Sequence, residues 1–199
     1  QMLELDLTTT QEEQVNIFAE EAFSYNKIHN LFVRVSIREI YRKDIADCLP
    51  LKNLLKPASS ILDVGTGAGF PGIILAITNP GCSITLAESN KKKTYFLKKI
   101  IKKIGLNNTA VIEEHITKQS NIGNFDVITA RAFASTKKII SICQHLLKKD
   151  GKYLLLKGKE ERIQEELQSI DKKLYKCEII KLDNKKEERH ILQITKEKK

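Results

Sequence analysis

The stretch Ile61-Leu62-Asp63-Val64-Gly65-Thr66-Gly67-Ala68-Gly69-Phe70-Pro71-Gly72 decides the fold of this chain. A short apolar run, typical of a buried parallel strand, leads directly into three alternating glycines. Glycines at this spacing allow a sharp turn between strand and helix and leave bare main chain against which a ligand can lie. A dinucleotide loop would read G-x-G-x-x-G, whereas here the third glycine comes one residue early and Phe70 takes the place of the last one. The pattern therefore favours S-adenosyl-L-methionine as the ligand.

Length and composition predict one main domain with a small extension. The chain has 199 residues, of which 41% are hydrophobic, and this is enough for one substantial core. No apolar run approaches the roughly 20 residues of a membrane span, and the N-terminus lacks the basic-then-apolar order of a secretion signal. We therefore expect a cytoplasmic protein without a membrane segment.

The four cysteines are scattered singly through apolar surroundings, at Cys48, Cys82, Cys143 and Cys177. The sequence contains no C-x-x-C pair and no histidine at a spacing that would suit zinc. The sequence therefore predicts buried thiols and no metal site.

The charge of the chain favours a nucleic-acid partner. Lysine and arginine number 34 against 25 aspartates and glutamates, which gives a formal net charge of +9. Cations that neutralise phosphates release counterions and give affinity that does not depend on base sequence. Nearly all of the charge is lysine, however, and an AT-rich coding sequence could supply such a bias without functional meaning.

Two capping boxes predict helices ahead of the glycine loop. Thr10-Gln11-Glu12-Glu13 opens an amphipathic helix over residues 11–28, and Ser36-Ile37-Arg38-Glu39 opens another that runs to about residue 49, where Pro50 stops it. The chain is therefore expected to begin with a helical extension.

Turn-forming residues at 56–60 mark the predicted boundary between a helical extension, residues 1–57, and the main domain, residues 58–199. In the main domain strands alternate with helical patterns, which gives a parallel sheet covered on both faces. The predicted strands are 61–64, 83–87, 110–112, 126–130, 153–156, 177–182 and 190–195. One predicted helix begins at Pro71, and three others cover 91–104, 135–147 and 160–169.

The last two predicted strands are joined by the polar run 183–188 without a helix, so they should pair antiparallel. A mostly parallel seven-stranded sheet that ends in an antiparallel hairpin is the α/β, Rossmann-like layout of class I methyltransferases. The fold analogy thus agrees with the glycine loop.

Ligands in open α/β sheets lie beyond the carboxyl ends of the strands. Glu88 follows the second strand, about 20 residues past the loop, where a carboxylate can accept both hydroxyls of a ribose; the alternative is a solvated glutamate ahead of a helix. Residues 114–117 follow the third strand and could flank an adenine. Arg131 follows the fourth strand, and its planar fork suits a carboxylate or phosphate, although a surface ion pair would also account for it.

Five segments carry further information in their order along the chain. They are Tyr25-Asn26-Lys27-Ile28-His29-Asn30-Leu31, the loop from Asp63 to Ile73, Thr129-Ala130-Arg131-Ala132, Leu156-Lys157-Gly158 and Glu188-Arg189-His190. Together they resemble the motifs of the RsmG (GidB) family, bacterial methyltransferases that modify a guanine of small-subunit ribosomal RNA at N7.

The resemblance implies that the chain transfers a methyl group from S-adenosylmethionine to N7 of a guanine in small-subunit (16S) ribosomal RNA. The cofactor contacts that it implies are Gly65, Gly67, Phe70, Glu88, Ile116, Thr117 and Arg131. The residues expected to position the RNA phosphates or the guanine edge, from their places at strand ends, are Arg131, Lys157, Arg189 and His190. Because guanine N7 already carries a free lone pair, we expect alignment of the reacting atoms and no general base.

Two alternatives remain open. A small-molecule methyltransferase would share the cofactor half, and would be indicated if the N-terminal helices closed a dry apolar pocket over the site instead of leaving a basic groove. A non-catalytic RNA-binding protein would be indicated if the chain did not bind S-adenosylmethionine. In each case a monomer is expected.

Overall fold

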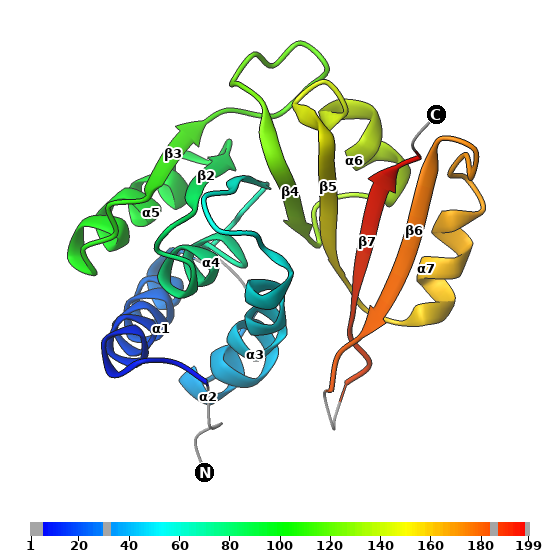
Figure 1. Ribbon diagram of the computed structural model, residues 1–199. Coiled ribbons are helices and arrows are strands. Elements are labelled where there is room, and N and C mark those ends of the chain that lie inside the picture. Colours follow the sequence, from blue (N-terminus) through cyan, green and yellow to red (C-terminus); the bar gives the residue numbers. More distant parts are fainter. Residues whose placement is uncertain (1–5, 30–32, 184–186, 198–199) are drawn as a thin grey trace.

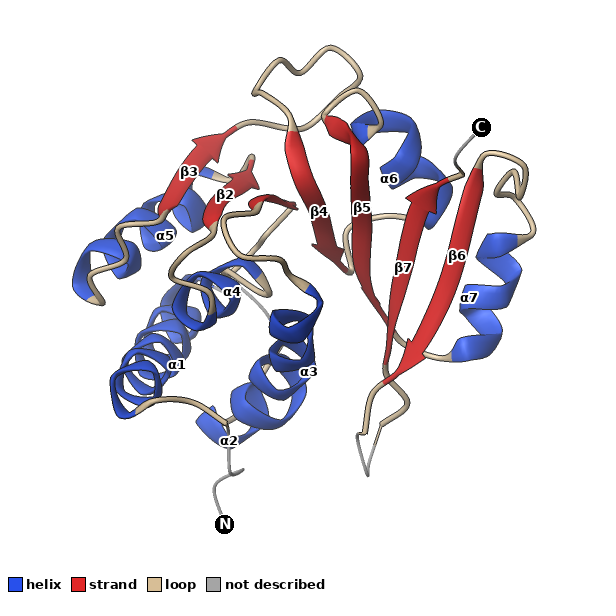
Figure 2. Ribbon diagram, viewed as in Figure 1, coloured by secondary structure: helices blue, strands red, loops and turns tan. Residues whose placement is uncertain are grey.

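One seven-stranded sheet spans the molecule (Figures 1 and 2). The computed structural model describes residues 6–29, 33–183 and 187–197. The strands lie in the order β3-β2-β1-β4-β5-β7-β6. Their bounds are Ser60–Val64 (β1), Ser83–Glu88 (β2), Thr109–Glu113 (β3), Phe125–Arg131 (β4), Leu147–Lys157 (β5), Tyr175–Lys181 (β6) and His190–Lys196 (β7).

The sheet is parallel from β3 to β5, and β7 runs antiparallel to both of its neighbours, β5 and β6. The predicted mostly parallel sheet with an antiparallel closing hairpin is therefore confirmed. Strand β1 lies between β2 and β4, so the strand order reverses there. In sheets of this kind the ligand crevice lies at that reversal, beyond the carboxyl ends of the strands.

Helices cover both faces of the sheet (Figure 1). On one face lie α1 (Thr9–His29), α4 (Gly72–Thr78) and α5 (Lys91–Lys103), which share one apolar cluster with the sheet. On the other face α6 (Thr136–Cys143) and α7 (Glu160–Leu167) enclose a second cluster. Helix α1 buries Phe18, whose ring centroid lies 5.0 Å from that of Phe70 in the glycine loop. The N-terminal helices thus pack directly behind the loop.

Residues 37–54 are helical throughout, in four consecutive pieces. They are α2 (Ile37–Ile40), the π-helical turn η1 (Tyr41–Ile45), α3 (Ala46–Cys48) and the 3-10 segment η2 (Leu49–Leu54). The capping box predicted at Ser36 is confirmed, because the Ser36 hydroxyl accepts the N–H of Glu39 at 3.2 Å. The box predicted at Thr10 is wrong: α1 begins at Thr9, and the reciprocal capping bonds join Thr8 and Gln11. The α-helix ends at Cys48, close to the predicted end at about residue 49, but Pro50 does not end the helical region, which continues as the 3-10 segment. Proline fits the first turn of the 3-10 segment, where its missing N–H is not needed.

A second boundary also differs from its prediction. The helix expected over 135–147 ends at Cys143, and β5 begins at Leu147, six residues before the predicted strand. The cause is pairing with β4, in which Leu147 lies opposite Phe125. At Gly151 the two strands are so close that a Cβ would lie 3.0 Å from the carbonyl oxygen of Asp126.

Three of the four cysteines, Cys48, Cys82 and Cys143, are buried as predicted, while Cys177 is half-buried. No helix within the described ranges is long and apolar enough to cross a membrane. Two parts of the predictions, Asn30-Leu31 of the family resemblance and residues 184–186 of the last polar run, lie outside the described residues.

Candidate functional site

A cleft of about 960 Å³ opens at the carboxyl ends of β1, β4 and β5. Residues 65–68 and 70 of the glycine loop form one wall, and residues 130–134, at the end of β4 and just after it, also line the cleft. The other wall consists of residues 156–159, at the end of β5 and just after it, together with residues of α7. The volume is within the range of small-molecule sites, and the position is that of ligand crevices in doubly wound sheets.

The glycine loop presents bare main chain to this cleft. Gly65 and Gly67 have φ values of +64° and +62°, in the left-handed region where side chains are strained. A Cβ on Gly65 would lie 2.2 Å from the Phe133 ring, so this glycine is required for packing. A Cβ on Gly67 would meet nothing closer than 3.9 Å. Gly67 therefore keeps the main chain accessible to a ligand.

Asp63 supports the loop from below. It is fully buried, and its Oδ2 accepts the N–H of Gly72 at 2.8 Å, at the start of α4. Burial raises the pKa of Asp63 to about 6, although the Thr66 hydroxyl, the Gly72 N–H and the charge of Arg131 act in the opposite direction. Asp63 is thus a buried carboxyl group with a raised pKa that binds the main chain at the end of the loop.

Glu88 ties the loop to α5. Its Oε2 accepts the N–H of Gly67 at 3.0 Å, and its Oε1 accepts the N–H of Asn90 at 2.8 Å. A carboxylate has about four acceptor positions, so these two bonds leave capacity for ribose hydroxyls. The predicted ribose contact stays a prediction, but the sequence did not indicate that Glu88 also holds the loop.

Ile116 and Thr117, like Glu88, lie outside the cleft lining. Ile116 is buried in the apolar cluster that contains Leu62 and Ala87. The N–H of Thr117 donates to the Ser120 hydroxyl at 3.0 Å. Their adenine contacts, like the ribose contact, stay predictions.

Arg131 lies in the cleft, where a buried carboxylate holds it. Its guanidinium is 2.6 Å from Asp44 and stands over the ring of Phe70, 5.2 Å from the centroid. Asp44 is 1% exposed and also binds Arg34 through two bonds of 2.7 and 2.8 Å. One carboxylate thus joins the N-terminal helices to the end of β4. Sequence reasoning missed this role, for which the only signal was a charged residue next to the apolar Ile45 within a helix.

Two of the other three predicted positioning residues also line the cleft, each paired with an acid. Lys157 is 2.8 Å from Glu166 on α7, and Arg189 is 2.9 Å from Asp47, which is buried. His190 differs, since it is fully buried and does not line the cleft. Three of the four predicted positioning residues are thus brought together.

The cleft is strongly basic. Its described lining carries eight basic side chains and two acidic ones. The basic side chains are those of Arg34, Lys43, Lys93, Arg131, Lys157, Lys159, Arg162 and Arg189.

Three of these cations, Lys93, Lys159 and Arg162, have no ion pair within the part of the chain that the structure describes. Sequence reasoning missed all three, because nothing local distinguishes them from other surface cations. They are the side chains most available to an anionic ligand.

Comparison with known proteins identifies relatives of the chain. The family model GidB, described as rRNA small subunit methyltransferase G, matches residues 11–194. A protein named Ribosomal RNA small subunit methyltransferase G from Brachyspira hyodysenteriae is 35% identical over 195 residues, which cover 96% of this chain and 94% of the relative. A protein of the same name from Halorhodospira halophila is 36% identical, with 86% and 80% of the two chains covered.

The fold also resembles a solved structure. A SAM dependent methyltransferase from Aquifex aeolicus superposes with a TM-score of 0.64 at 15% sequence identity, covering 87% of this chain and 98% of the other. At this identity the similarity shows the fold alone. It confirms the predicted Rossmann-like methyltransferase architecture.

Proposed function

The chain belongs to the GidB family, rRNA small subunit methyltransferase G, and we propose that it transfers a methyl group from S-adenosylmethionine to N7 of a guanine in small-subunit ribosomal RNA. The observation that carries this proposal is the cleft itself, in which a glycine loop faces eight basic side chains across one opening. A cofactor site and a polyanion site thus share the same space.

The glycine loop fits S-adenosylmethionine. The Cβ position of Gly67 is open, so a ligand can approach the main chain there, and the Glu88 carboxylate beside it keeps acceptor positions for hydroxyls. We expect Gly65, Gly67, Phe70, Glu88, Ile116, Thr117 and Arg131 to hold it. When bound, S-adenosylmethionine supplies a methyl group on a positively charged sulfur.

The basic lining supports RNA as the substrate. Arg34, Lys43, Arg131, Lys157 and Arg189 are fixed by carboxylates and can shape the cleft without free movement. The three unpaired cations can bind phosphates directly. A small-molecule methyltransferase would instead be expected to enclose a dry apolar pocket, so the lining favours RNA over that alternative.

The chemistry of the lining agrees with a reaction that requires no proton transfer. No histidine or cysteine is found among the described residues of the cleft, and the two acids present, Asp47 and Glu166, are both engaged by cations. Guanine N7 attacks through its own lone pair, so the residues need only align the base and exclude water. The lining is therefore sufficient for the proposed reaction.

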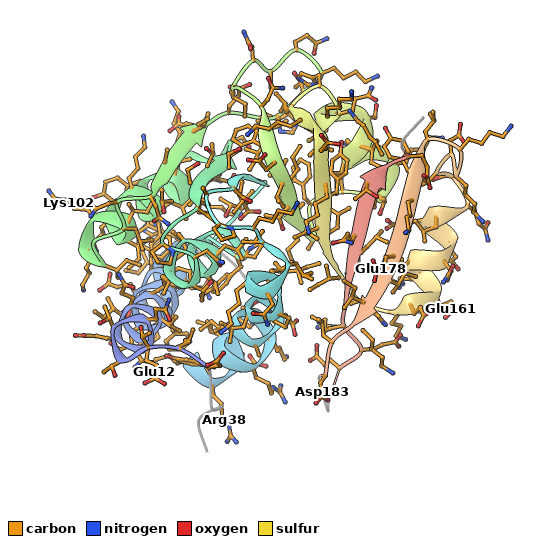
Figure 3. All side chains as sticks on the ribbon, in the orientation of Figure 1. Glu12, Arg38, Lys102, Glu161, Glu178 and Asp183 are labelled. Carbon is orange, nitrogen blue, oxygen red and sulfur yellow. The ribbon has the colours of Figure 1, made fainter. Side chains whose placement is uncertain are left out.

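The direct test incubates the purified chain with methyl-labelled S-adenosylmethionine and small-subunit ribosomal RNA, either free or in the assembled particle. Label at a single guanine, located by borohydride reduction and aniline cleavage at N7-methylguanine, is the expected result. Arg131→Ala should abolish labelling, whereas Arg38→Ala should not, because Arg38 is exposed on α2 (Figure 3) and does not line the cleft. Unlabelled RNA with the wild-type chain would overturn the proposal.

The non-catalytic alternative has its own test. Calorimetry in which millimolar S-adenosylmethionine releases or absorbs no heat would support an RNA-binding protein without catalysis. The monomeric state and the cytoplasmic location stay predictions, and light scattering on the purified chain measures the first of them.

A further inference from the structure

Three side chains meet beside the cleft, at the start of β7. They are Glu160, the first residue of α7, Glu188, which precedes β7, and His190, the first residue of β7. His190 Nε2 lies 3.8 Å from Glu160 Oε2 and 3.9 Å from Glu188 Oε1. One ligand atom from each residue lies within 4.8 Å of the other two. In Figure 1 the starts of α7 and β7 lie next to the end of β5.

The orientation of the imidazole is fixed from its other nitrogen. His190 Nδ1 lies 2.7 Å from the carbonyl oxygen of Gly158. A carbonyl oxygen only accepts, so Nδ1 carries the hydrogen and donates it. Histidines that bind metals commonly donate their second nitrogen to a backbone carbonyl in this way, which orients the free nitrogen towards the ion.

The free nitrogen has no partner. His190 is fully buried, and its Nε2 makes no hydrogen bond in the described structure. Buried polar atoms are nearly always satisfied, and an exception calls for an unfilled partner such as an ion. The unpartnered atom faces the two carboxylates and points to a ligand between them.

The distances separate a metal site from a hydrogen-bonded ion pair. An imidazolium bound to a carboxylate would lie about 2.7–2.9 Å from its oxygen, whereas the two nitrogen–oxygen separations here are 3.8 and 3.9 Å. Ligand atoms that each lie about 2.0–2.2 Å from a shared ion are roughly 3–4 Å apart. The observed spacing is therefore that of atoms arranged around an ion.

The charge of the cluster fits a divalent cation. Neither Glu160 nor Glu188 forms an ion pair with lysine or arginine within the described ranges. Their side chains are 52% and 43% exposed, so an ion can enter from solvent. Glu188 Oε1 also accepts the N–H of Glu160 at 2.8 Å, which holds one carboxylate in place.

We propose that Glu160, Glu188 and His190 form a Zn²⁺ site with three protein ligands and a fourth position open to water. Imidazole nitrogen with carboxylate oxygen is a ligand set that zinc accepts, while Mg²⁺ and Ca²⁺ prefer oxygen alone. The ion would fasten the start of α7 to β7, next to Lys159 and Arg189 of the cleft. The site does not depend on the proposed methyl transfer, since its test measures metal binding.

Calorimetry of the untagged full-length chain, stripped with EDTA and titrated with ZnCl₂, tests the proposal. One zinc per chain is expected, with at least tenfold weaker binding in Glu160→Gln and Glu188→Gln. A third variant, His190→Gln, alters a buried side chain and can fail to fold. The test therefore relies on the two glutamate variants, whose side chains are exposed. Glu161→Gln is the matched control, because Glu161 is the exposed neighbour on α7 outside the cluster (Figure 3).

Cobalt identifies the ligands by absorption. Co²⁺ bound in place of zinc should give visible bands without the near-ultraviolet charge-transfer band of a thiolate. The proposal is overturned if wild type binds no zinc, if Glu160→Gln and Glu188→Gln bind zinc no more weakly than Glu161→Gln, or if a thiolate band shows that a cysteine holds the metal.

Discussion

The glycine loop on one wall of the cleft is held by carboxylates that lie near it in the sequence, whereas two arginines of the cleft, Arg131 and Arg189, are held by buried acids far from them in the sequence. The loop is fastened by Asp63, nine residues from its partner Gly72, and by Glu88, twenty-one residues from Gly67. Arg189, by contrast, reaches Asp47 across 142 residues of sequence. The loop can therefore be recognised from local sequence, whereas the partners of these two arginines cannot.

The two walls should also respond differently to substitution. A change in the loop alters one backbone surface and the ligand that lies on it. A change in the buried acids Asp44 or Asp47 releases a cation and loosens the N-terminal helices together. The four predictions below test this difference, in order of decreasing effect.

The largest effect is expected for Asp44→Ala. It removes the carboxylate that Arg34 and Arg131 share and leaves two partly buried cations unpaired. The free energy of unfolding should fall by about 3 kcal/mol, because breaking a buried ion pair from one side leaves an uncompensated charge. Denaturant titration measures it.

Glu21→Ala is the matched control for Asp44→Ala. Glu21 is also shared by two cations, Lys99 and Lys103, but these lie at the surface. Its loss should change the free energy of unfolding by less than about 1 kcal/mol. Equal effects of the two variants would show that burial of Asp44 does not matter.

The second prediction concerns pH and the support of the loop. Between pH 4 and 6 the folded chain retains a proton on Asp63 that the unfolded chain releases, so ionisation of Asp63 lowers the free energy of unfolding as the pH rises. Asp63→Asn removes this effect. Between pH 4 and pH 7, the free energy of unfolding of the variant should rise by about 2 kcal/mol relative to that of wild type. Thermal and urea unfolding at several pH values measure the difference.

Asp126→Asn provides the control of opposite sign. Despite burial, which raises it, the pKa of Asp126 is lowered to about 2 by hydrogen bonds from Ser60 and Lys148. This carboxylate stabilises the fold above the pKa of the unfolded chain, and the contribution is lost as the pH falls towards 2. Above pH 5 the free energy of unfolding of Asp126→Asn should therefore be lower than that of wild type by a constant amount. If the free energy of unfolding of Asp63→Asn were lower than that of wild type with the same pH dependence, the raised pKa of Asp63 would be contradicted.

The third prediction is that Gly67→Ala weakens S-adenosylmethionine binding at least tenfold. The methyl group would occupy the open main-chain surface, and alanine at φ +62° is strained by about 1 kcal/mol. Calorimetry measures the affinity, with Gly81→Ala as control, since no atom lies within 4 Å of a Cβ there. Unchanged affinity in Gly67→Ala would place the cofactor elsewhere.

The smallest effect is expected for the double variant Lys159→Ala with Arg162→Ala. Loss of two unpaired cations should weaken RNA binding about three- to tenfold and reduce its salt dependence, while S-adenosylmethionine affinity stays the same. Filter binding at several salt concentrations measures the RNA affinity and its salt dependence, and calorimetry measures the S-adenosylmethionine affinity. The control, Lys98→Ala with Lys102→Ala, removes the same charge from exposed positions of α5, of which Lys102 is labelled in Figure 3. Equal losses in the two variants would show that only net charge matters.

Much of the fold follows from local patterns. The strands, the antiparallel hairpin and the helix behind Ser36 were predicted, because apolar periodicity and capping residues act within a few positions. The errors lie where tertiary contacts override local preference. Pro50 is accommodated by the 3-10 segment, and β5 begins early because β4 offers Phe125 as a partner for Leu147.

The candidate site divides in the same way. Gly65, Gly67, Phe70, Arg131, Lys157 and Arg189 were singled out from motifs, and all of them line the cleft. The roles of Asp44, Lys159 and Arg162 were not predicted, because the residues next to an acid in a helix or a cation on a surface do not indicate which partner it binds.

The sequence alone determined the parallel sheet and the glycine turn after its first strand, because both follow from patterns of neighbouring residues. It also determined the surplus of positive charge, which follows from composition. Tertiary structure alone decided which cations are held by carboxylates and which remain free in the cleft. It also brought Glu160, 28 residues from Glu188, to the buried nitrogen of His190. Such pairings depend on distance in space, and folding sets that distance only once the strands and helices have packed.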